Sequence, residues 1–584
     1  MYFRTPTFTT TSVRMHILRL VFLYLFVVLS ACNVYAGERP KLIVVLSYDQ
    51  LRYDRLSCFA EDFGADGFKR VLNAGARYDS CFYNHAINMT GPGHAVLLSG
   101  YNPRRTGIVG NDFFDRKKNR QLYATEDTSG VLSPRNLRVP TIGDVLKRSS
   151  PESKVIGIAL KDRAAIFMSG HSANYALWLN DDKRNLGTSA HYRAPKWLAE
   201  FNDKYALSGY AGKTWNALQA PPRLPDPREV QQRVQNLAPG QDPTKILPPI
   251  TLSQRISMLD DLPWEGNFPG GGNAFPHVIP SVGDKEFVDA FSCTPYSIDW
   301  IMEAVRMCMQ EEKLGKDDAT DILCIGISTT DEVGHVFGPH SREMKEILMN
   351  ADRSLASFID MLDKEIGRDA YELVMTSDHG VAEVPENRMI NSGMSTGRIS
   401  RKQVDSALTA PYQRFAPLSL SNDNTAPPPS FMKRFIPPFI FLDSAAVAPI
   451  AADFNAACDS LVGALRTLPG IGYAVSARDV LNGKRPATMD SAVFSCIFQS
   501  LDVDRSGDII VFPSRGWIFG SKTTTHGTPY DYDQHVPMIF FGGGIPHSVH
   551  SERVSPADLA PTLAKQLGLP LGPVDGKALE PDQK

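Results

Sequence analysis

The stretch "KLIVVLSYDQLRYD" (residues 41–54) joins a continuous apolar run to a dense group of polar side chains. A short apolar run of this kind is typical of a strand that is buried on both faces of a sheet. The first carboxylate after it, Asp49, has two interpretations: it caps a following helix, or it is the first of several ligands gathered at one edge of the sheet. The stretch by itself leaves both interpretations open.

Similar apolar runs, each followed by polar or glycine-rich residues, recur along the chain. They are "KLIVVLS" (41–47), "KVIGIAL" (154–160), "DILCIGIS" (321–328), "YELVMTS" (371–377), "DIIVFP" (508–513) and "PMIFFGG" (537–543). Helical patterns lie between several of them, for example at 297–311 and 341–364. Because buried strands that alternate with helices form parallel sheets, we expect an α/β fold with a mostly parallel central sheet flanked by helices on both faces.

Two stretches, at about 181–290 and 391–500, do not follow this alternation. The first is rich in Pro, Gly, Asn and Trp, and the second contains "APPPSF" together with a separate βα-like portion. Since long structureless loops are uncommon in compact domains, we interpret both as insertions that form a rim or cap over the sheet edge. We therefore expect a single domain over residues 39–580 that carries these two insertions.

The bulk composition is that of an ordinary globular protein. The chain has 584 residues, of which 43% are hydrophobic, and its formal net charge is −3 with no long run of like charge. A large core can form, and neither a nucleic-acid partner nor an extended anionic-membrane surface is expected. We expect a monomer.

The N-terminal segment (residues 1–36) has the pattern of a secretory signal peptide. Positive residues at Arg4, Arg14 and Arg19 precede or border the apolar run "LVFLYLFVVLSA" (20–31), which is short for a membrane span. Two processing sites compete: "LSAC" (29–32) resembles a lipoprotein box that would leave Cys32 lipidated, and "VYA" (34–36) suits ordinary signal peptidase. Either site predicts an exported protein, which is periplasmic, secreted, or anchored to the outer membrane through Cys32.

Polar residues of metal-binding type follow several of the expected strands. Ligands of open α/β sheets bind beyond the carboxyl ends of the strands, so these positions are informative. The residues are Asp49, Asp331 and His335 in "TTDEVGH", Asp378 and His379 in "SDHG", and His526 in "TTTHG". Each has an ordinary structural explanation when taken alone, as a turn or a solvated helix face. Together, three carboxylates and three imidazoles suit two divalent ions of the zinc type, which can clamp the attacking and leaving oxygens of a phosphoryl transfer.

A hydroxyl residue, Thr90, lies within "NMTGPGHAVLLSGYNPRRTGIVGND" (88–112), just before an apolar helical start. In most proteins a hydroxyl at this position is a helix N-cap. Beside a zinc ion the same hydroxyl can ionise and become a nucleophile. Both interpretations of Thr90 remain open from the residues alone.

The ordered set "YDQ", "MTGPGH", "GND", "LKDR", "TTDEVGH", "SDHG" and "TTTHG" resembles the alkaline phosphatase superfamily. The resemblance is greatest to the secreted bacterial alkaline phosphatases of the PafA type, and it runs from about Arg39 to the C-terminus. It implies two Zn²⁺ per chain and Thr90 as the nucleophile. The implied ligands are Asp331, His335 and His526 for one ion, and Asp49, Asp378, His379 and Thr90 for the other.

The expected phosphate pocket distinguishes monoesterases from diesterases in this superfamily. Lys161 and Arg163 are two residues apart in "LKDRAA", so in extended backbone both side chains point the same way. The resemblance implies that this pair and Asn111 bind the non-bridging oxygens of a phosphate monoester. The related phosphodiesterases and nucleotide pyrophosphatases generally lack the pair.

The expected function is thus a zinc-dependent alkaline phosphatase that hydrolyses small phosphate monoesters through a phosphothreonine intermediate. A phosphodiesterase or nucleotide pyrophosphatase of the same superfamily is the alternative, because the Pro in "TGPGH" is familiar from the diesterases. A non-catalytic lipoprotein that binds zinc or phosphate is the third hypothesis, against which the complete ligand set argues.

Overall fold

The computed structural model describes residues 39–218, 251–387, 390–391, 393–415, 431–447 and 454–581. The expected signal peptide, including Cys32 and both processing sites, lies outside the described residues. Parts of the two expected insertions, at 219–250 and 416–430, also lie outside them.

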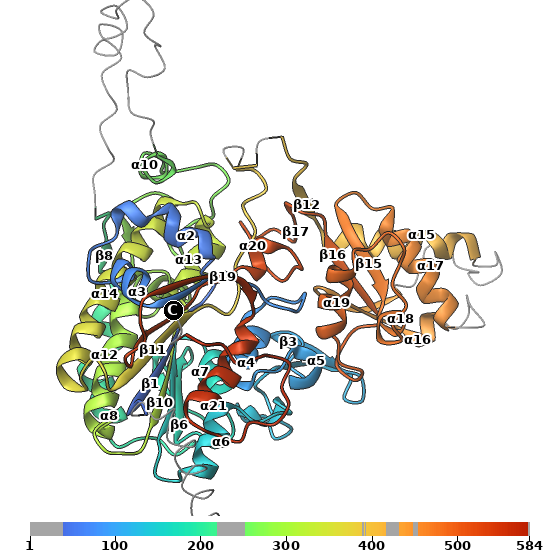
Figure 1. Ribbon diagram of the computed structural model, residues 1–584. Coiled ribbons are helices and arrows are strands. Elements are labelled where there is room, and N and C mark those ends of the chain that lie inside the picture. The colour runs from blue at the N-terminus through green and yellow to red at the C-terminus, as the bar shows by residue number, and fades with distance from the viewer. Residues whose placement is uncertain are drawn as a thin grey trace, which may run out of the picture.

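A nine-stranded sheet forms the centre of the molecule (Figure 1). Its strands, in spatial order, are β19 (Ser548–Val554), β2 (Ala76–Cys81), β18 (Met538–Gly542), β11 (Tyr371–Thr376), β1 (Leu42–Tyr48), β10 (Asp321–Ile327), β5 (Val155–Ala159), β6 (Tyr175–Asn180) and β7 (Asn185–Gly187). Five of its eight pairings are parallel, and the antiparallel ones involve β18 and β7. The expected α/β class with a mostly parallel sheet is confirmed.

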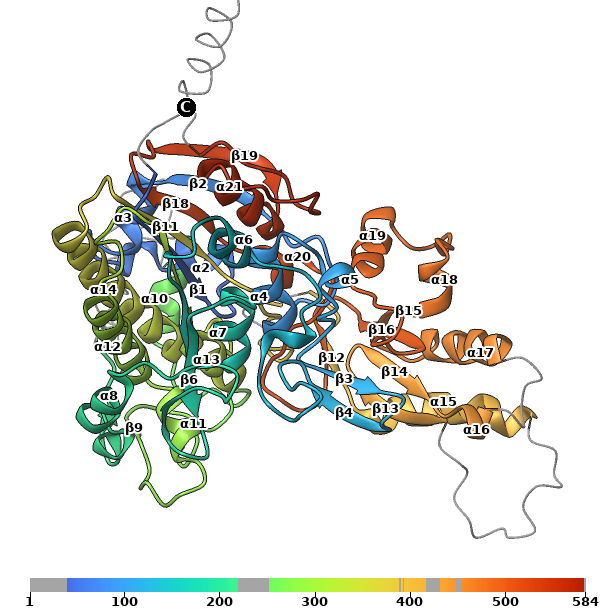
Figure 2. The ribbon, with the colours of Figure 1, turned by 90° about the horizontal axis from the view of Figure 1, so that it is seen from below.

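Helices cover both faces of this sheet (Figures 1 and 2). One face carries α3 (Phe68–Ala74), α8 (Leu198–Lys204), α12 (Pro295–Glu312) and α14 (Arg342–Glu365). The other face carries α4 (Thr90–Ser99), α6 (Ile142–Ser149), α7 (Asp162–Ser169) and α21 (Leu559–Gln566). Helices were expected at 297–311 and 341–364, and α12 and α14 lie there. Every residue of β1, β10 and β11 is buried, as strands covered on both faces require.

A second lobe, residues 397–519, extends from the main body (Figure 2). Its four-stranded sheet has the order β13 (Met432–Ile436), β14 (Phe439–Leu442), β16 (Ile509–Pro513) and β15 (Ile471–Ser476), with antiparallel pairings. The other elements of the lobe are β12 (Gly397–Ile399), α15 (Arg401–Phe415), α16 (Ser444–Val447), α17 (Phe454–Arg466), α18 (Ala477–Leu481), α19 (Ser491–Gln499) and β17 (Trp517–Phe519).

The assignment of "DIIVFP" (508–513) to the rhythm of the central sheet is therefore wrong, because this run forms β16 of the second lobe. The lobe also buries both faces of its sheet. Ile509 and Val511 pack into one apolar cluster, and Ile510 and Phe512 pack into another. A continuous apolar run shows that a strand is covered on both sides, but it carries no information about which sheet it joins.

Smaller elements occupy the connections of the main body. They are α2 (Tyr53–Cys58), α5 (Pro103–Thr106), the hairpin of β3 (Asp112–Asp115) and β4 (Arg120–Tyr123), β8 (Thr214–Trp215), α10 (Leu252–Ser257), β9 (His277–Val278), α11 (Phe287–Ser292), α13 (Thr329–Phe337) and α20 (Asp531–Gln534). A single catalytic domain over residues 39–580 with insertions at about 181–290 and 391–500 stays our proposal for the domain organisation.

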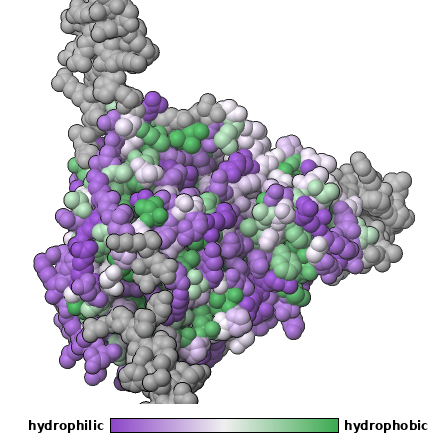
Figure 3. All heavy atoms as spheres, viewed as in Figure 1, coloured by the Kyte–Doolittle hydropathy of each residue, from purple (hydrophilic) through white to green (hydrophobic). Residues whose placement is uncertain are grey.

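Hydrophilic residues cover most of the face seen in Figure 3, and hydrophobic ones appear there in small separate groups. Among the described helices, none combines the length and the apolar character that a membrane crossing requires.

Candidate active site

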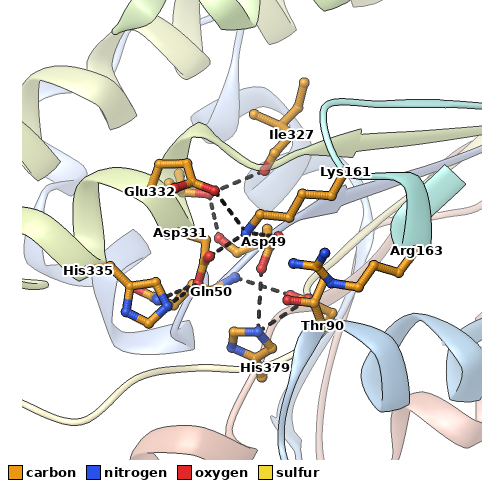
Figure 4. A network of polar contacts seen from close by, with 12 residues as sticks. Asp49, Gln50, Thr90, Lys161, Arg163, Ile327, Asp331, Glu332, His335 and His379 are labelled. Atoms are coloured by element: carbon orange, nitrogen blue, oxygen red, sulfur yellow. Dashed lines mark hydrogen bonds and ion pairs between the residues drawn. The ribbon is translucent and has the colours of Figure 1, made fainter. Parts of the chain in front are cut away.

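Four neighbouring parallel strands, β11, β1, β10 and β5, end at the same edge of the central sheet. The residues that follow them supply Asp378 and His379, Asp49, Asp331, and Lys161, respectively. Figure 4 shows how these side chains lie relative to one another: Asp49, Asp331 and the end of Lys161 lie at the centre, with His335 on one side and Thr90, Arg163 and His379 on the other. The candidate site residues therefore lie beyond the carboxyl ends of the strands, where ligands of open α/β sheets bind.

Asp49 does not cap the helix that follows it. That helix, α2, begins at Tyr53 and has Arg52 at its N-cap position, without a capping side-chain hydrogen bond. Asp49 is fully buried, and its backbone N–H donates to the carbonyl of Ile327 at the end of β10, 2.9 Å away. The carboxylate is thus left to face the sheet edge, and the capping interpretation is excluded.

Asp331 and His335 both lie on α13, one helical turn apart. The distance from His335 Nε2 to Asp331 Oδ1 is 3.4 Å, as the i, i+4 spacing predicts. His526 joins them from the loop before α20, with its Nε2 3.6 Å from the same oxygen.

All three imidazoles are oriented by main-chain carbonyls. Nδ1 of His335 contacts the carbonyl of Thr524 at 3.0 Å, Nδ1 of His379 contacts that of Gly380 at 2.8 Å, and Nδ1 of His526 contacts that of Asn88 at 2.8 Å. A carbonyl oxygen can only accept, so Nδ1 carries the proton and Nε2 keeps its lone pair. This is the arrangement of metal-binding histidines, in which the second ring nitrogen is fixed by a neighbouring acceptor.

The ligand atoms form two triads that share one residue. Asp49, Asp378 and His379 make one, and Asp331, His379 and His526 make the other, with the ligand atoms of each triad within 4.8 Å of one another. The rings of His379 and His526 stack at 3.7 Å. The grouping differs from the one that the resemblance implies, because His379 belongs to both triads and His335 lies beside the second one.

The chemistry of the first triad fits a divalent cation. Asp49 Oδ1, Asp378 Oδ2 and His379 Nε2 are buried and have no hydrogen-bond partner within the described part of the chain. His379 Nε2 is 3.4 Å from each of these two oxygens. Burial and then the neighbouring Asp49 carboxylate raise the pKa of Asp378 well above its ordinary value. Two of these three ligand atoms belong to mutually repelling carboxylates, and a shared positive ion would compensate this repulsion.

Thr90 is the first helical residue of α4, and Met89 occupies the N-cap position. The Thr90 hydroxyl makes no capping bond and no other hydrogen bond within the described residues, although the side chain is buried. It is therefore available for chemistry, and the N-cap interpretation is excluded. The helix approaches the metal-site loop closely at Gly93, where a Cβ atom would lie 2.1 Å from the carbonyl oxygen of Asp378. Only glycine allows this approach.

The expected phosphate-binding residues lie beside Thr90, but the backbone that carries two of them is extended only as far as Lys161 and is helical from Asp162 on. Lys161 is the N-cap residue of α7, and Arg163 lies in its first turn. Both side chains nonetheless reach toward the site from the same side (Figure 4). Lys161 Nζ is 3.0 Å from Asp49 Oδ2 and also pairs with Asp331 and Glu332. Asn111 Oδ1 accepts the Gly91 N–H at 2.8 Å, which leaves its amide nitrogen as the donor.

Sequence reasoning missed Gln50 as a residue of the site. Its N–H donates to Asp378 Oδ1 at 3.1 Å and its side-chain amide donates to Asp331 Oδ1, so it links the two triads. The backbone has a positive φ of 67°, which is rare for a residue other than glycine. A Cβ at position 334 would lie 1.8 Å from Gln50 Oε1, which explains the glycine in "DEVGH". The only sequence signal for Gln50 was its place in "YDQ".

The sequence profile of the type I phosphodiesterase / nucleotide pyrophosphatase family matches residues 43–536. The chain belongs to this family, within the superfamily that its motifs resemble.

Individual relatives cover nearly the whole chain. The alkaline phosphatase PhoV of Synechococcus elongatus is 29% identical over 550 residues, covering 91% of this chain and 90% of PhoV. The alkaline phosphatase PafA of Elizabethkingia meningoseptica is 28% identical over 559 residues, covering 92% of this chain and 93% of PafA. The crystal structure of wild-type PafA aligns with a TM-score of 0.76 at 26% identity, covering 93% of this chain and 99% of that one.

Proposed function

We propose that this protein is an alkaline phosphatase that hydrolyses phosphate monoesters through a phosphothreonine on Thr90, with two zinc ions per chain. The observation that carries the proposal is the position of Thr90, whose hydroxyl has no hydrogen-bond partner among the described residues, beside two triads of carboxylate and imidazole groups (Figure 4). The similarity to PhoV and PafA over more than nine-tenths of the chain supports the same class of reaction.

In this proposal Asp331, His335 and His526 hold one ion. Asp49, Asp378 and His379 hold the other together with Thr90. When bound, the two ions supply positive charge that favours the ionised Thr90 hydroxyl and the negative charge on the departing oxygen. The shared contacts of His379 support two ions that lie close together.

Thr90 Oγ1 attacks the phosphorus in line, the bond from phosphorus to the ester oxygen breaks, and that oxygen leaves and takes up a proton as the alcohol. Water then attacks the phosphothreonine, inorganic phosphate leaves, and the Thr90 hydroxyl regains its proton. Lys161, Arg163 and Asn111 hold the non-bridging oxygens, where negative charge resides in the transition state.

The two cationic side chains favour a monoester over a diester. A terminal phosphate carries two negative charges and has three non-bridging oxygens, so Lys161 and Arg163 gain more from it than from a singly charged diester. The family also contains phosphodiesterases, as its name states, and the resemblance implies that the Pro in "TGPGH" is of the diesterase type. Diester hydrolysis is therefore the second candidate function.

The apolar segment at 20–31 supports export of the chain, and both processing sites are compatible with it. The relatives support small phosphate esters as substrates, and the net charge of −3 gives no indication of a nucleic-acid partner. A monomer remains part of the proposal.

The deciding experiment compares phenyl phosphate with its methyl diester, using wild-type protein and Thr90→Ala. We expect the wild type to prefer the monoester by at least about a hundredfold in kcat/KM, because two cations contact the dianion. Chelation should abolish turnover, and added zinc should restore it. A preference for the diester would favour the second candidate function, and full turnover by Thr90→Ala would exclude the threonine nucleophile.

A further inference from the structure

The guanidinium of Arg163 is held by a tyrosine from the β3–β4 hairpin. Arg163 Nη1 donates to the hydroxyl of Tyr123, and the guanidinium carbon lies 5.5 Å from the centre of the Tyr123 ring. The same hydroxyl donates to Asp162 Oδ1 at 2.7 Å. Tyr123 therefore touches the side chains of both residues that open α7.

Asp162 forms an ion pair with Arg163, but its two carboxylate oxygens accept their hydrogen bonds from other residues. Its Oδ1 accepts from Tyr123 and its Oδ2 accepts from the hydroxyl of Thr125 at 2.5 Å. The distance between Arg163 Nη1 and Asp162 Oδ1 is 3.7 Å, too long for a hydrogen bond. The Tyr123 hydroxyl accepts from the cation and donates to the carboxylate, so it bridges the two groups of this ion pair.

This arrangement leaves one edge of the guanidinium available. Nη1 is used by Tyr123, whereas Nε is buried and has no partner within the described part of the chain. Nε–H and one N–H of Nη2 are parallel donors on the opposite edge, and such a pair binds two oxygens of one phosphate. The buried, unpartnered Nε is an expensive group to leave alone, so its position indicates that a ligand oxygen completes it.

The hairpin also carries another of the proposed phosphate donors. Tyr123 lies opposite Asp112 in the β3–β4 pairing, and the N–H of Ala124 donates to the carbonyl of Asn111 at 2.9 Å. Asn111 and Tyr123 are therefore fixed to each other across the open end of one hairpin. A single element sets the positions of the Asn111 amide and, through Tyr123, the Arg163 guanidinium.

We propose that Tyr123 is a positioning residue that aims the Nε–Nη2 edge of Arg163 at the substrate phosphate and thereby sets the preference for dianionic monoesters. This proposal rests on the proposed function and deepens it, because it assigns the discrimination to one hydroxyl. Tyr123 acts through Arg163 and does not itself touch the reacting atoms. Burial raises the pKa of Tyr123, the charge of Arg163 lowers it, and the charge of Asp162 raises it, with a net increase. The hydroxyl therefore keeps the proton that it donates to Asp162.

The test uses Tyr123→Phe, which keeps the ring over the guanidinium and removes only the hydroxyl. A matched control is Tyr205→Phe, which removes the hydroxyl of a half-buried residue bonded to Glu303 Oε2 at 3.0 Å. Tyr205 is the C-cap residue of α8, on the opposite face of the central sheet from α7. We expect Tyr123→Phe to lower kcat/KM for phenyl phosphate about tenfold and to weaken inorganic phosphate binding by a similar factor, as loss of a hydrogen bond to a charged group does. Hydrolysis of the methyl diester should change by less than about twofold, and Tyr205→Phe should leave all three quantities unchanged.

A second comparison separates positioning from a general structural effect. In an Arg163→Ala background, Tyr123→Phe should have no further effect on the monoester, because the group that it positions is gone. An equal loss on monoester and diester, or an undiminished loss in the Arg163→Ala background, would overturn the proposal.

Titration calorimetry of wild type and Tyr123→Phe with inorganic phosphate decides the same question without turnover. Unchanged phosphate affinity in Tyr123→Phe overturns the positioning role. If Thr90→Ala turns over phenyl phosphate as fast as the wild type does, only the proposed function is overturned.

Discussion

Single side chains of the candidate site are oriented mainly by the backbone. Each of the three imidazoles donates its Nδ1 proton to a main-chain carbonyl, from Thr524, Gly380 or Asn88. Main-chain carbonyls do not titrate, so the tautomer with a free Nε2 does not depend on the protonation of a neighbouring acid. The acidic residues of the site are thereby left free to act as the ligands that we propose.

Gly93 meets a strict steric requirement at this scale, because the atom that a Cβ would meet belongs to the backbone. We expect Gly93→Ala to lower activity toward phenyl phosphate roughly a hundredfold, since a methyl group 2.1 Å from the Asp378 carbonyl must displace either Thr90 or the Asp378 loop. Overpacking of this kind also costs about 1–3 kcal/mol of stability. Steady-state kinetics and denaturant unfolding of the same preparation measure both effects.

Gly463→Ala is the matched control, because Gly463 lies exposed on α17 and a methyl group there would meet no atom within 4 Å. Replacing a mid-helix glycine at this position should raise stability by about 0.5–1 kcal/mol and leave activity unchanged. Normal kinetics for Gly93→Ala would contradict the close approach of α4 to the Asp378 loop.

At the scale of elements, the first turn of α14 contacts β9 through two buried side chains, the carboxyl group of Glu343 and the imidazole of His277. Glu343, in the first turn of α14, is fully buried, and its Oε1 lies 3.1 Å from Nε2 of His277 in β9. Burial raises the pKa of Glu343 to about 8 and lowers the pKa of His277 to about 4. Although the distance is that of an ion pair, these shifts describe a neutral pair at pH 6, in which the carboxyl group donates to the imidazole. We favour the neutral pair because burial, the largest cause of both pKa shifts, penalises the charged form of each group.

The pair predicts a loss of stability at alkaline pH. Between about 4.5 and 6.5 the extra proton that folded Glu343 keeps is balanced by the proton that folded His277 lacks, so the two contributions cancel. From about 6.5 to 8 only Glu343 holds more protons in the folded state, so stability falls with rising pH by up to about 2 kcal/mol.

Glu343→Gln should keep the stability measured at pH 6.5 and reduce the decline between pH 6.5 and 9, because the amide cannot ionise. The pKa of Glu265, which burial and Glu343 together raise to about 8, should fall in the variant and flatten the decline further. Denaturant unfolding at several pH values measures this. An unaltered slope in Glu343→Gln would show that Glu343 ionises normally in the folded protein.

The elements differ in how well the sequence predicts them. Strands β1, β5, β10 and β11 could be named from their apolar runs, because burial on both faces requires such runs. The start of α7 was missed: Lys161 ends an extended segment, and Arg163 is already helical, because "DRAAIFMS" has a helical apolar pattern that overrides the expected continuation. The expectation that Lys161 and Arg163 point the same way is correct, but the extended backbone from which it was argued ends at Lys161.

At the scale of the whole molecule, the candidate site draws on segments hundreds of residues apart, from Asp49 to His526. Its ligand residues could be named from the sequence because metal ligands are few in type and follow strands that can be recognised. Gln50 and Tyr123 could not, since an amide and a phenol have many ordinary uses and only three-dimensional packing shows their partners. The placement of β16 in the second lobe was equally hidden, because the sheet that a strand joins depends on distant segments.

A bound metal ion would therefore act as a cross-link between distant parts of the chain, as well as a catalyst. Asp378 and Asp49 follow neighbouring strands, and His526 comes from a loop beyond the second lobe. Ligands that bind only the folded state stabilise it by about 4 kcal/mol per site at a thousandfold excess over Kd. We expect chelation to lower the Tm of the wild type and added zinc to restore it, with magnesium much less effective because nitrogen ligands favour zinc.

Asp378→Asn makes this prediction sharper, because the order of the two proteins should reverse. Without zinc the variant should be the more stable one, since it removes a buried carboxylate whose pKa is raised by burial and by Asp49. With zinc the wild type should be the more stable one, because the amide is a weaker ligand and leaves one ion poorly held. Thermal unfolding of both proteins, each with its zinc content measured, tests the reversal. If removal of all zinc left the wild-type Tm unchanged, the buried carboxylates would have to be compensated by protons or by Lys161 alone, and the two-ion proposal would fail.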